Sequence, residues 1–145
     1  MLHVGSVPPA ATRALRQRVL RPHQTAEELA HPKETLRETG SFAATLDGEI
    51  VGTALVFPEV RGESAALRPW RLVALAVDPA HRRSGLATRL IERCIDHARG
   101  RGSDELWCHA RTGAVRFYES AGFSATGAEW QEEHTGPHVL MWLPI

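Results

Sequence analysis

The sequence predicts a single mixed α/β domain over residues 1–145. Three observations predict it. The chain has the length of one compact domain rather than two. Its centre has the pattern of a buried strand at residues 71–77, an amphipathic helix from Gly85, and another strand at residues 106–110. An Asp-Gly pair separates two apolar runs before this unit, which is typical of a β-hairpin.

The N-terminal segment is expected to form a strand followed by a helix. Residues 2–5 have the composition of a short strand. Ser6 is expected to cap a helix that begins at Pro8 or Pro9, because proline is tolerated in the first turn of a helix. Apolar side chains then recur every four residues, at Ala11, Leu15 and Val19.

The polar segment over residues 21–40 is expected to be a surface connection within the domain. It contains two prolines and few apolar side chains. Thr25 and Glu28 have the spacing of a capping box, in which each side chain bonds to the other residue's backbone N–H. This spacing predicts a brief second helix from about Ala26.

A β-hairpin and a central strand are expected next. The apolar runs at residues 42–46 and 49–57 are separated only by Asp47-Gly48, and Asp-Gly favours a tight two-residue turn. Residues 71–77 are apolar on both faces, which is typical of a strand in the middle of a sheet.

The hydrophobic period changes to that of a helix after Gly85. Apolar residues fall on one helical face and charged residues on the opposite one, and Gly100 is expected to end the helix. The remaining elements are expected in this order: a strand at residues 106–110, a short helix ending at Gly122, and closing strands at residues 123–130 and 138–143.

Composition and charge exclude several classes of protein. Hydrophobic residues make up 43% and charged residues 23% of the chain, which argues against disorder. Lys plus Arg and Asp plus Glu each number 17, so binding to nucleic acid through bulk charge is not expected. No run approaches the roughly 20 apolar residues of a membrane span, and no signal-peptide pattern is present.

The two cysteines, Cys94 and Cys108, match no metal or redox spacing. We expect them to be free core thiols in a reducing compartment, and hence a cytoplasmic protein. We expect no membrane partner, no nucleic-acid partner and no bound metal.

The loop before Gly85 is predicted to bind a phosphate group. Backbone N–H groups in the first turn of a helix have no intrahelical partner, and the helix dipole is positive there. Gly85 and Ala87 allow close approach to the backbone, and Arg82 and Arg83 can add charge-assisted hydrogen bonds. The spacing fits neither a P-loop nor a dinucleotide-binding loop. Taken alone, a loop with this sequence is more often a solvent-exposed start of a helix that binds no ligand.

A second motif changes that interpretation. Residues 82–87 (RRSGLA) fit the [RQ]-x-x-G-x-[GA] pyrophosphate loop of the GNAT superfamily of acyl-CoA-dependent N-acetyltransferases, and residues 114–123 fit its A-x-x-[LF]-Y-x-x-x-G-[FY] helix. The chain resembles this family from about Phe42 to its end. The last strands, with Gly136-Pro137-His138 and Met141, are similar to a small bacterial subgroup that ends in G-P-H-x-x-M. One departure is Arg111, which stands where many members carry Asn.

The resemblance implies the GNAT fold: an α/β fold whose mixed, mostly antiparallel central sheet has two splayed parallel strands and is flanked by helices. Pantetheine lies between the splayed strands of such proteins and bonds to their free edges. The residues implied to bind acetyl-CoA are Leu75, Ala76, Val77, Arg82, Arg83, Ser84, Gly85, Leu86, Ala87 and Thr88.

The implied reaction is transfer of an acetyl group from acetyl-CoA to a primary amine by direct attack in a ternary complex. Neither cysteine occupies a recognisable nucleophile position. Tyr118 falls where the family often places the acid that protonates the departing thiolate. The alternative is a core tyrosine with its hydroxyl bonded to backbone. The acceptor is expected to be a small-molecule or peptide amine, and the protein a monomer or homodimer.

The sequence does not decide which group removes the proton from the amine. Acidic and histidine side chains cluster near the end of the chain, at Glu132, Glu133, His134 and His138. Glu132 and His138 are the main candidates for this base. His109 and ordered water are further candidates. Gly136-Pro137 argues against a helical histidine pair and hence against a zinc site.

Trp130, beside this cluster, is the tryptophan expected to line an acceptor pocket. Two rival functions remain at this point. One is a module that binds acyl-CoA without catalysis, and the other is an arginine-rich nucleic-acid binder, against which the neutral charge argues.

Overall fold

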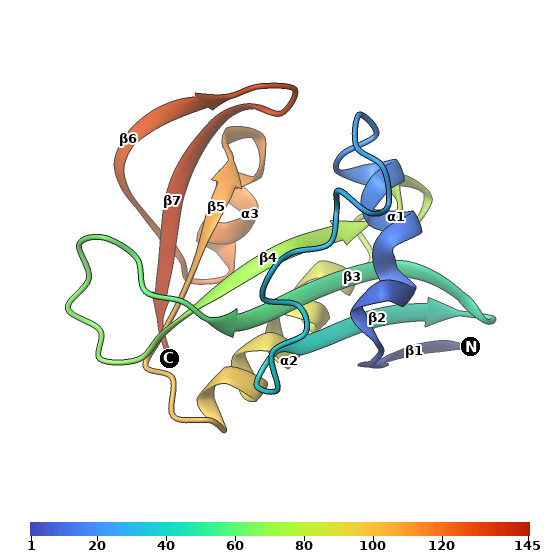
Figure 1. The fold of residues 1–145 in the computed structure, drawn as a ribbon, viewed down its shortest axis with the longest axis horizontal. Coiled ribbons are helices and arrows are strands. Elements are labelled where there is room, and N and C mark those ends of the chain that lie inside the picture. Colours follow the sequence, from blue (N-terminus) through green and yellow to red (C-terminus); the bar gives the residue numbers. More distant parts are fainter.

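A seven-stranded sheet with strand order β1-β2-β3-β4-β5-β7-β6 organises the computed structural model, which describes residues 1–145 (Figure 1). Neighbouring strands are antiparallel except β4 and β5, which are parallel. The expected mixed, mostly antiparallel sheet is therefore confirmed. Its strands are β1 (Leu2–Ser6), β2 (Gly40–Leu46), β3 (Glu49–Pro58), β4 (Pro69–Val77), β5 (Glu105–Arg111), β6 (Ser124–Glu132) and β7 (Gly136–Pro144).

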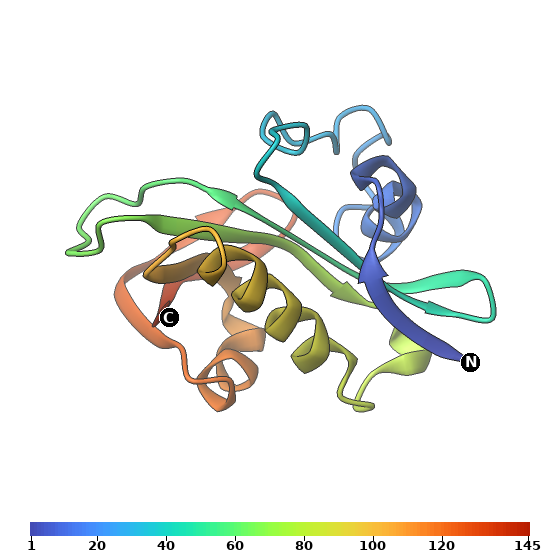
Figure 2. The ribbon, with the colours of Figure 1, turned by 90° about the horizontal axis from the view of Figure 1, so that it is seen from below.

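Helices cover both faces of the sheet (Figure 2). Helices α2 (Leu86–Arg99) and α3 (Val115–Ser120) lie on one face, while α1 (Arg13–Val19) and residues 20–39 lie on the other. Short 3-10 helices occur at η1 (Pro9–Thr12), η2 (Pro79–His81) and η3 (Thr112–Ala114). The predicted hairpin turn is present, with Asp47 and Gly48 both at positive φ, as a tight two-residue turn requires.

Two details of the N-terminal prediction are wrong. Ser6 is the last residue of β1 and caps no helix; the chain enters a 3-10 helix at Pro9 and then α1, without a side-chain cap. Thr25 and Glu28 do exchange both capping-box hydrogen bonds, at 3.0 and 3.2 Å, but only turns follow. Pro32 comes too soon after them, since the residue before a proline is disfavoured in the helical region.

The segment over residues 21–39 is more than a surface connection, because two of its side chains are buried. Leu29 and Glu34 are only 7% and 4% exposed. Arg16 on α1 donates to the Leu29 carbonyl at 2.7 Å, and Glu34 forms ion pairs with Arg16, at 3.4 Å, and with Arg13. A buried carboxylate is tolerated when it is paired in this way. The network therefore holds the segment against α1.

The main core lies between the sheet and the apolar face of α2. Leu86, Leu90, Ile91, Cys94 and Ala98 of this helix are all buried, which confirms the predicted helical period. Gly100 follows as its C-cap. Both cysteines are free and buried, as expected.

Strands β4 and β5 are paired at one end only. The parallel register joins Pro69 to Glu105, Trp70 to Leu106 and Arg71 to Trp107, and it stops there. Beyond this point β4 remains paired with β3 and β5 with β7, while the two strands diverge (Figure 1). The expected splay is thus confirmed, and it leaves the facing strand edges without strand partners.

A β-bulge in β4 lies next to the opening. Val73 is opposite Leu55 and Ala76 is opposite Thr53, so both Ala74 and Leu75 face Ala54 on β3. Ala74 has a φ of 55°, a left-handed conformation that is uncommon for residues other than glycine. Bulges of this kind redirect the backbone beside functional sites.

The backbone at Ala74 yields a stability prediction. Ala74→Val places a β-branched side chain at positive φ, which is strained. We expect it to lower the free energy of unfolding by about 1–3 kcal/mol and Tm by several degrees, measured by thermal unfolding. Ala74→Gly is the matched control and should retain the wild-type Tm to within a few degrees. An Ala74→Val protein as stable as the wild type would contradict this conformation.

Candidate active site

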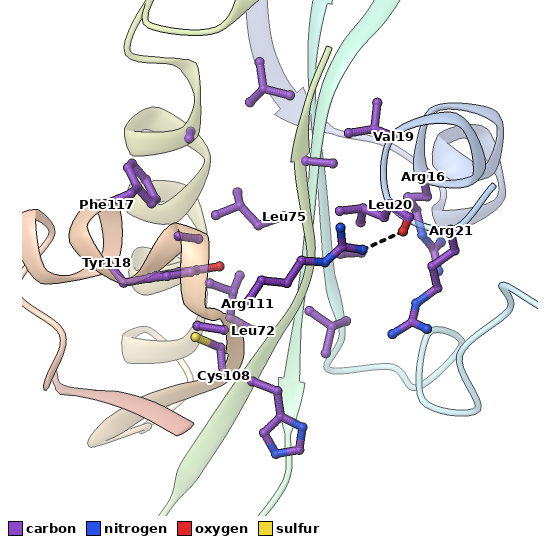
Figure 3. Close-up of a pocket in the computed structure, with 18 of the residues that line it drawn as sticks. Arg16, Val19, Leu20, Arg21, Leu72, Leu75, Cys108, Arg111, Phe117 and Tyr118 are labelled. Atoms are coloured by element: carbon purple, nitrogen blue, oxygen red, sulfur yellow. Dashed lines mark hydrogen bonds between the residues drawn. The ribbon is translucent and has the colours of Figure 1, made fainter. Parts of the chain in front are cut away.

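A cavity of about 980 Å³ lies where β4 and β5 separate. On one face of the sheet its walls come from the first turn of α2 and from α3; we call this the α2 side. On the other face they come from α1 and residues 20–32; we call this the α1 side. Figure 3 shows labelled residues from both sides converging on this space. The cavity therefore connects the two faces of the sheet.

The first turn of α2 presents free backbone donors to the cavity. Its N-cap is Gly85, with a φ of 80° and no side-chain cap, and the first intrahelical bond runs from the Arg89 N–H to the Gly85 carbonyl at 3.1 Å. The N–H groups of Leu86, Ala87 and Thr88 consequently have no intrahelical partner. No atom lies within 4 Å of the position that a Cβ on Gly85 would take. This turn therefore suits a bound anion.

The residues expected to bind acetyl-CoA line the cavity, with the exception of Ser84. The Ser84 hydroxyl donates instead to the His81 carbonyl, at 2.5 Å, and shapes the loop. Arg82 lines the cavity and its Nε also donates to the Val77 carbonyl at 3.3 Å, which ties the loop to the end of β4. Arg83 lines the cavity without an acidic partner.

Tyr118 lies in the wall on the α2 side. Its ring packs edge-on against Phe123, with centroids 5.3 Å apart, and is buried. Figure 3 shows the side chain extending from α3 into the cavity beside Cys108. Burial raises the pKa of the Tyr118 hydroxyl well above its usual value, and the neighbouring Cys108 raises it further. The phenol is therefore protonated at neutral pH.

Glu132 and His138 are brought together in the lining of the cavity. The His138 side chain is buried, and its Nδ1 lies 2.8 Å from the Gly136 carbonyl and 3.6 Å from Glu132 Oε2. A carbonyl can only accept a hydrogen bond, so Nδ1 carries the hydrogen of the neutral ring and Nε2 keeps its lone pair. Trp130 Nε1 donates to the same carboxylate at 3.1 Å.

The other members of the C-terminal cluster do not join this pair. Glu133 is exposed, and His134 stacks on His23 outside the cavity, at 4.3 Å between ring centroids. Trp130 is also outside the cavity wall and packs behind it, with its ring centroid 4.9 Å from that of His109.

His109 does line the cavity, where Arg71 Nη2 lies 3.1 Å from its Nδ1. Burial lowers the pKa of His109, and the charge of Arg71 lowers it further.

Several cavity residues were not anticipated from the sequence. Much of the α1 side comes from the segment interpreted as a surface connection, including Arg21, Gln24 and His31. Arg111 crosses from β5 to α1, where its Nη2 donates to the Leu20 carbonyl at 2.5 Å (Figure 3). The placement of Arg21 depends on contacts far apart in the sequence, which no local pattern encodes.

The structure contains no cluster of three or more His, Cys, Asp or Glu side chains suited to a metal ion. None of its helices has both the length and the apolar character needed to cross a membrane.

Comparison with known proteins decides the family. The model of the acetyltransferase (GNAT) family matches residues 10–123, most of the chain. The chain belongs to the GNAT acetyltransferase family. It is therefore an acyl-CoA-dependent enzyme that transfers an acetyl group to an amine, as the two motifs predicted.

Relatives of this GNAT acetyltransferase agree with that assignment. The N-acetyltransferase YitI of Bacillus subtilis is 23% identical over 142 residues, which cover 98% of this chain and 95% of that protein. The [ribosomal protein bS18]-alanine N-acetyltransferase of Escherichia coli is 41% identical over 87 residues, which cover 58% of this chain and 54% of that enzyme.

Solved structures share the fold over the full chain. The crystal structure of the E. coli ribosomal-protein-S18-alanine N-acetyltransferase has a TM-score of 0.76 and 26% identity, covering 100% of this chain and 94% of that one. An aminoglycoside 6'-N-acetyltransferase complexed with coenzyme A has a TM-score of 0.72 at 15% identity, covering 98% of this chain and 96% of that one.

The burial of Tyr118 yields a spectroscopic prediction. Tyr118 is the only tyrosine in the chain, so tyrosinate absorbance near 295 nm reports on one residue. Because its pKa is raised, the folded protein should show no tyrosinate signal as the pH passes 10, whereas unfolded protein should titrate near 10. The Tyr118→Phe protein supplies the baseline. Half-titration near pH 10 in the folded protein would contradict the buried position.

Proposed function

We propose that this enzyme acetylates the primary amine of a small molecule or peptide by direct attack within a ternary complex, and that its two substrates enter from opposite faces of the sheet. The observation that carries the proposal is the cavity between β4 and β5. It has free helix N–H groups on its α2 side and the Glu132–His138 pair toward its α1 side. Relatives named for a ribosomal-protein alanine and for an aminoglycoside cover both acceptor classes.

Acetyl-CoA is assigned to the α2 side. The N–H groups of the first turn of α2 would bind its diphosphate, with Arg82 and Arg83 adding charge. The free edge of β4 at Leu75, Ala76 and Val77 would bond to the amide groups of pantetheine, as a neighbouring strand would do. The unpaired edge, the open space at Gly85 and the arginines without acidic partners all fit this ligand.

His138 is assigned as the base that takes a proton from the ammonium form of the acceptor, which leaves a neutral amine. Its Nε2 is the lone-pair nitrogen, and Glu132 stabilises the imidazolium that forms. The neutral amine nitrogen then attacks the thioester carbonyl and forms the C–N bond. The attacking nitrogen releases its second proton to solvent, and the C–S bond breaks.

Tyr118 is assigned as the acid that supplies the proton of the CoA thiol as the C–S bond breaks. The tyrosine regains a proton from solvent, so the products are the amide and the free thiol. Its raised pKa keeps that proton available at neutral pH.

Cys108 lines the cavity, so a covalent acetyl-enzyme needs separate consideration. Burial raises the pKa of Cys108 to about 12. The thiolate is the nucleophilic form of cysteine, and almost none is present at neutral pH. Direct attack by the amine is therefore favoured over a path through Cys108.

Replacing the acid tests the catalytic assignment. Tyr118→Phe should lower kcat on a reactive amine by about 10²-fold or more, while calorimetry should find the acetyl-CoA Kd unchanged because the ring still packs. An unchanged kcat would remove Tyr118 from the mechanism. A wild-type protein that binds acetyl-CoA but acetylates no amine would instead be a binding module.

Replacing the base distinguishes the two cavity histidines. His138→Gln should lower kcat by about 10²-fold or more. His109→Gln is the matched control and should change kcat much less. Equal, small effects of both variants would assign deprotonation to ordered water.

A further inference from the structure

The arginines that line the cavity differ in whether an acidic side chain pairs with them. Arg16 is paired with Glu34 at 3.4 Å and Arg71 with Glu59 at 2.9 Å. No carboxylate oxygen lies within 4.0 Å of the guanidinium of Arg21 or Arg111. Arg21 follows α1 and Arg111 bonds to the carbonyl of Leu20 (Figure 3), whereas the arginines assigned to the diphosphate precede the first turn of α2. The cavity therefore has a second cationic site that acetyl-CoA does not explain.

Arg111 is fixed in a position that leaves most of its donors free. It is the last residue of β5 and lies directly opposite His138 on β7, so both side chains project from the same face of the sheet. Its Nη2 donates to the Leu20 carbonyl, and it makes no other hydrogen bond. A guanidinium has five N–H donors. Arg21 follows Leu20 directly, and its side chain makes no hydrogen bond to the protein.

The acidic groups on this side do not neutralise these arginines. The Glu28 carboxylate accepts a hydrogen bond from the Thr25 backbone N–H, and Glu132 accepts one from Trp130. Burial lowers the pKa of the Arg111 guanidinium, and the charge of Arg21 lowers it further, which outweighs the opposite effect of Glu132. The two guanidinium groups thus repel each other in a half-buried site, and a bound anion would relieve that repulsion.

We infer that Arg111 and Arg21 bind a carboxylate of the acceptor, so that the substrate is an amine that also carries a carboxylate, as an amino acid does. The inference rests on the proposed function, because it takes the α1 side as the acceptor's entry. The planar fork of arginine matches a carboxylate with paired hydrogen bonds. A doubly charged phosphate would be repelled more strongly by Glu28 and Glu132, which line the same side.

A panel of matched amines tests the inference. Glycine, L-alanine and β-alanine are each compared with the corresponding amide, and 2-aminoethyl phosphate is included as a phosphate analogue. We expect kcat/KM for at least one acid to exceed that of its amide by about tenfold or more, as lost charge-assisted hydrogen bonds predict. The amine group of each amide loses its proton more readily than the amine group of the corresponding acid. A preference for the acids would therefore oppose the intrinsic reactivity of the amines.

Two variants locate the carboxylate site. Arg111→Gln and Arg21→Gln should each raise KM for the acid by about tenfold or more, leave KM for the amide nearly unchanged, and preserve the Kd for acetyl-CoA. Arg111→Lys keeps the positive charge but lacks the planar fork of arginine. Its KM for the acid should therefore lie between those of the wild type and Arg111→Gln. Arg116→Gln, an exposed arginine of α3 outside the cavity, is the control and should behave as the wild type.

The outcomes separate this inference from the proposed function. If the wild type acetylates acids and amides equally well, or prefers the phosphate, the carboxylate site is wrong while acetyl transfer stands. The same holds if Arg111→Gln weakens acid and amide alike. If no amine on a wide panel is acetylated, the proposed function itself fails and this inference fails with it.

Discussion

The separation of two parallel strands after three paired residues is the constraint on which the rest of the structure depends. Once β4 leaves β5 beyond Arg71, each strand presents backbone groups that no neighbouring strand satisfies. Such groups are costly to bury unless something bonds to them. The unpaired edges and the cavity between them make a ligand with its own amide groups a suitable partner. The sheet thus acquires a binding site through incomplete hydrogen bonding rather than through an added domain.

Polar contacts lie at both ends of the opening. At the closed end, Arg61 makes two 2.9 Å bonds to the buried carboxylate of Glu105, which Ser64 also contacts. At the open end, Arg111 reaches from β5 to the last turn of α1. The Arg16–Glu34 pair then holds residues 21–39 over the cavity. Removing one partner of the Arg61–Glu105 or the Arg16–Glu34 pair would leave an uncompensated charge, so these two ion pairs are costly to break singly.

Local signals predicted some parts of this structure from the sequence, and long-range packing decided the others. The Asp47-Gly48 turn, the period of α2 and the glycine that opens it are encoded within a few neighbouring residues. The splay was expected only through the resemblance of the two motifs to a family. Thr25 and Glu28 form their local bonds yet make no helix, because Pro32 limits the segment. The bulge at Ala74 and the placement of Arg21 and Arg111 depend on strand register and on contacts between distant segments.

Hydrogen exchange with and without acetyl-CoA tests the central claim most directly. If the ligand completes the free edge of β4 and caps α2, amides in residues 72–77 and in the first turn of α2 should exchange more slowly when acetyl-CoA is bound. Amides in β1 and β2, far from the cavity, should be much less affected. Protection confined to other parts of the chain, or no protection at saturating acetyl-CoA, would contradict the account.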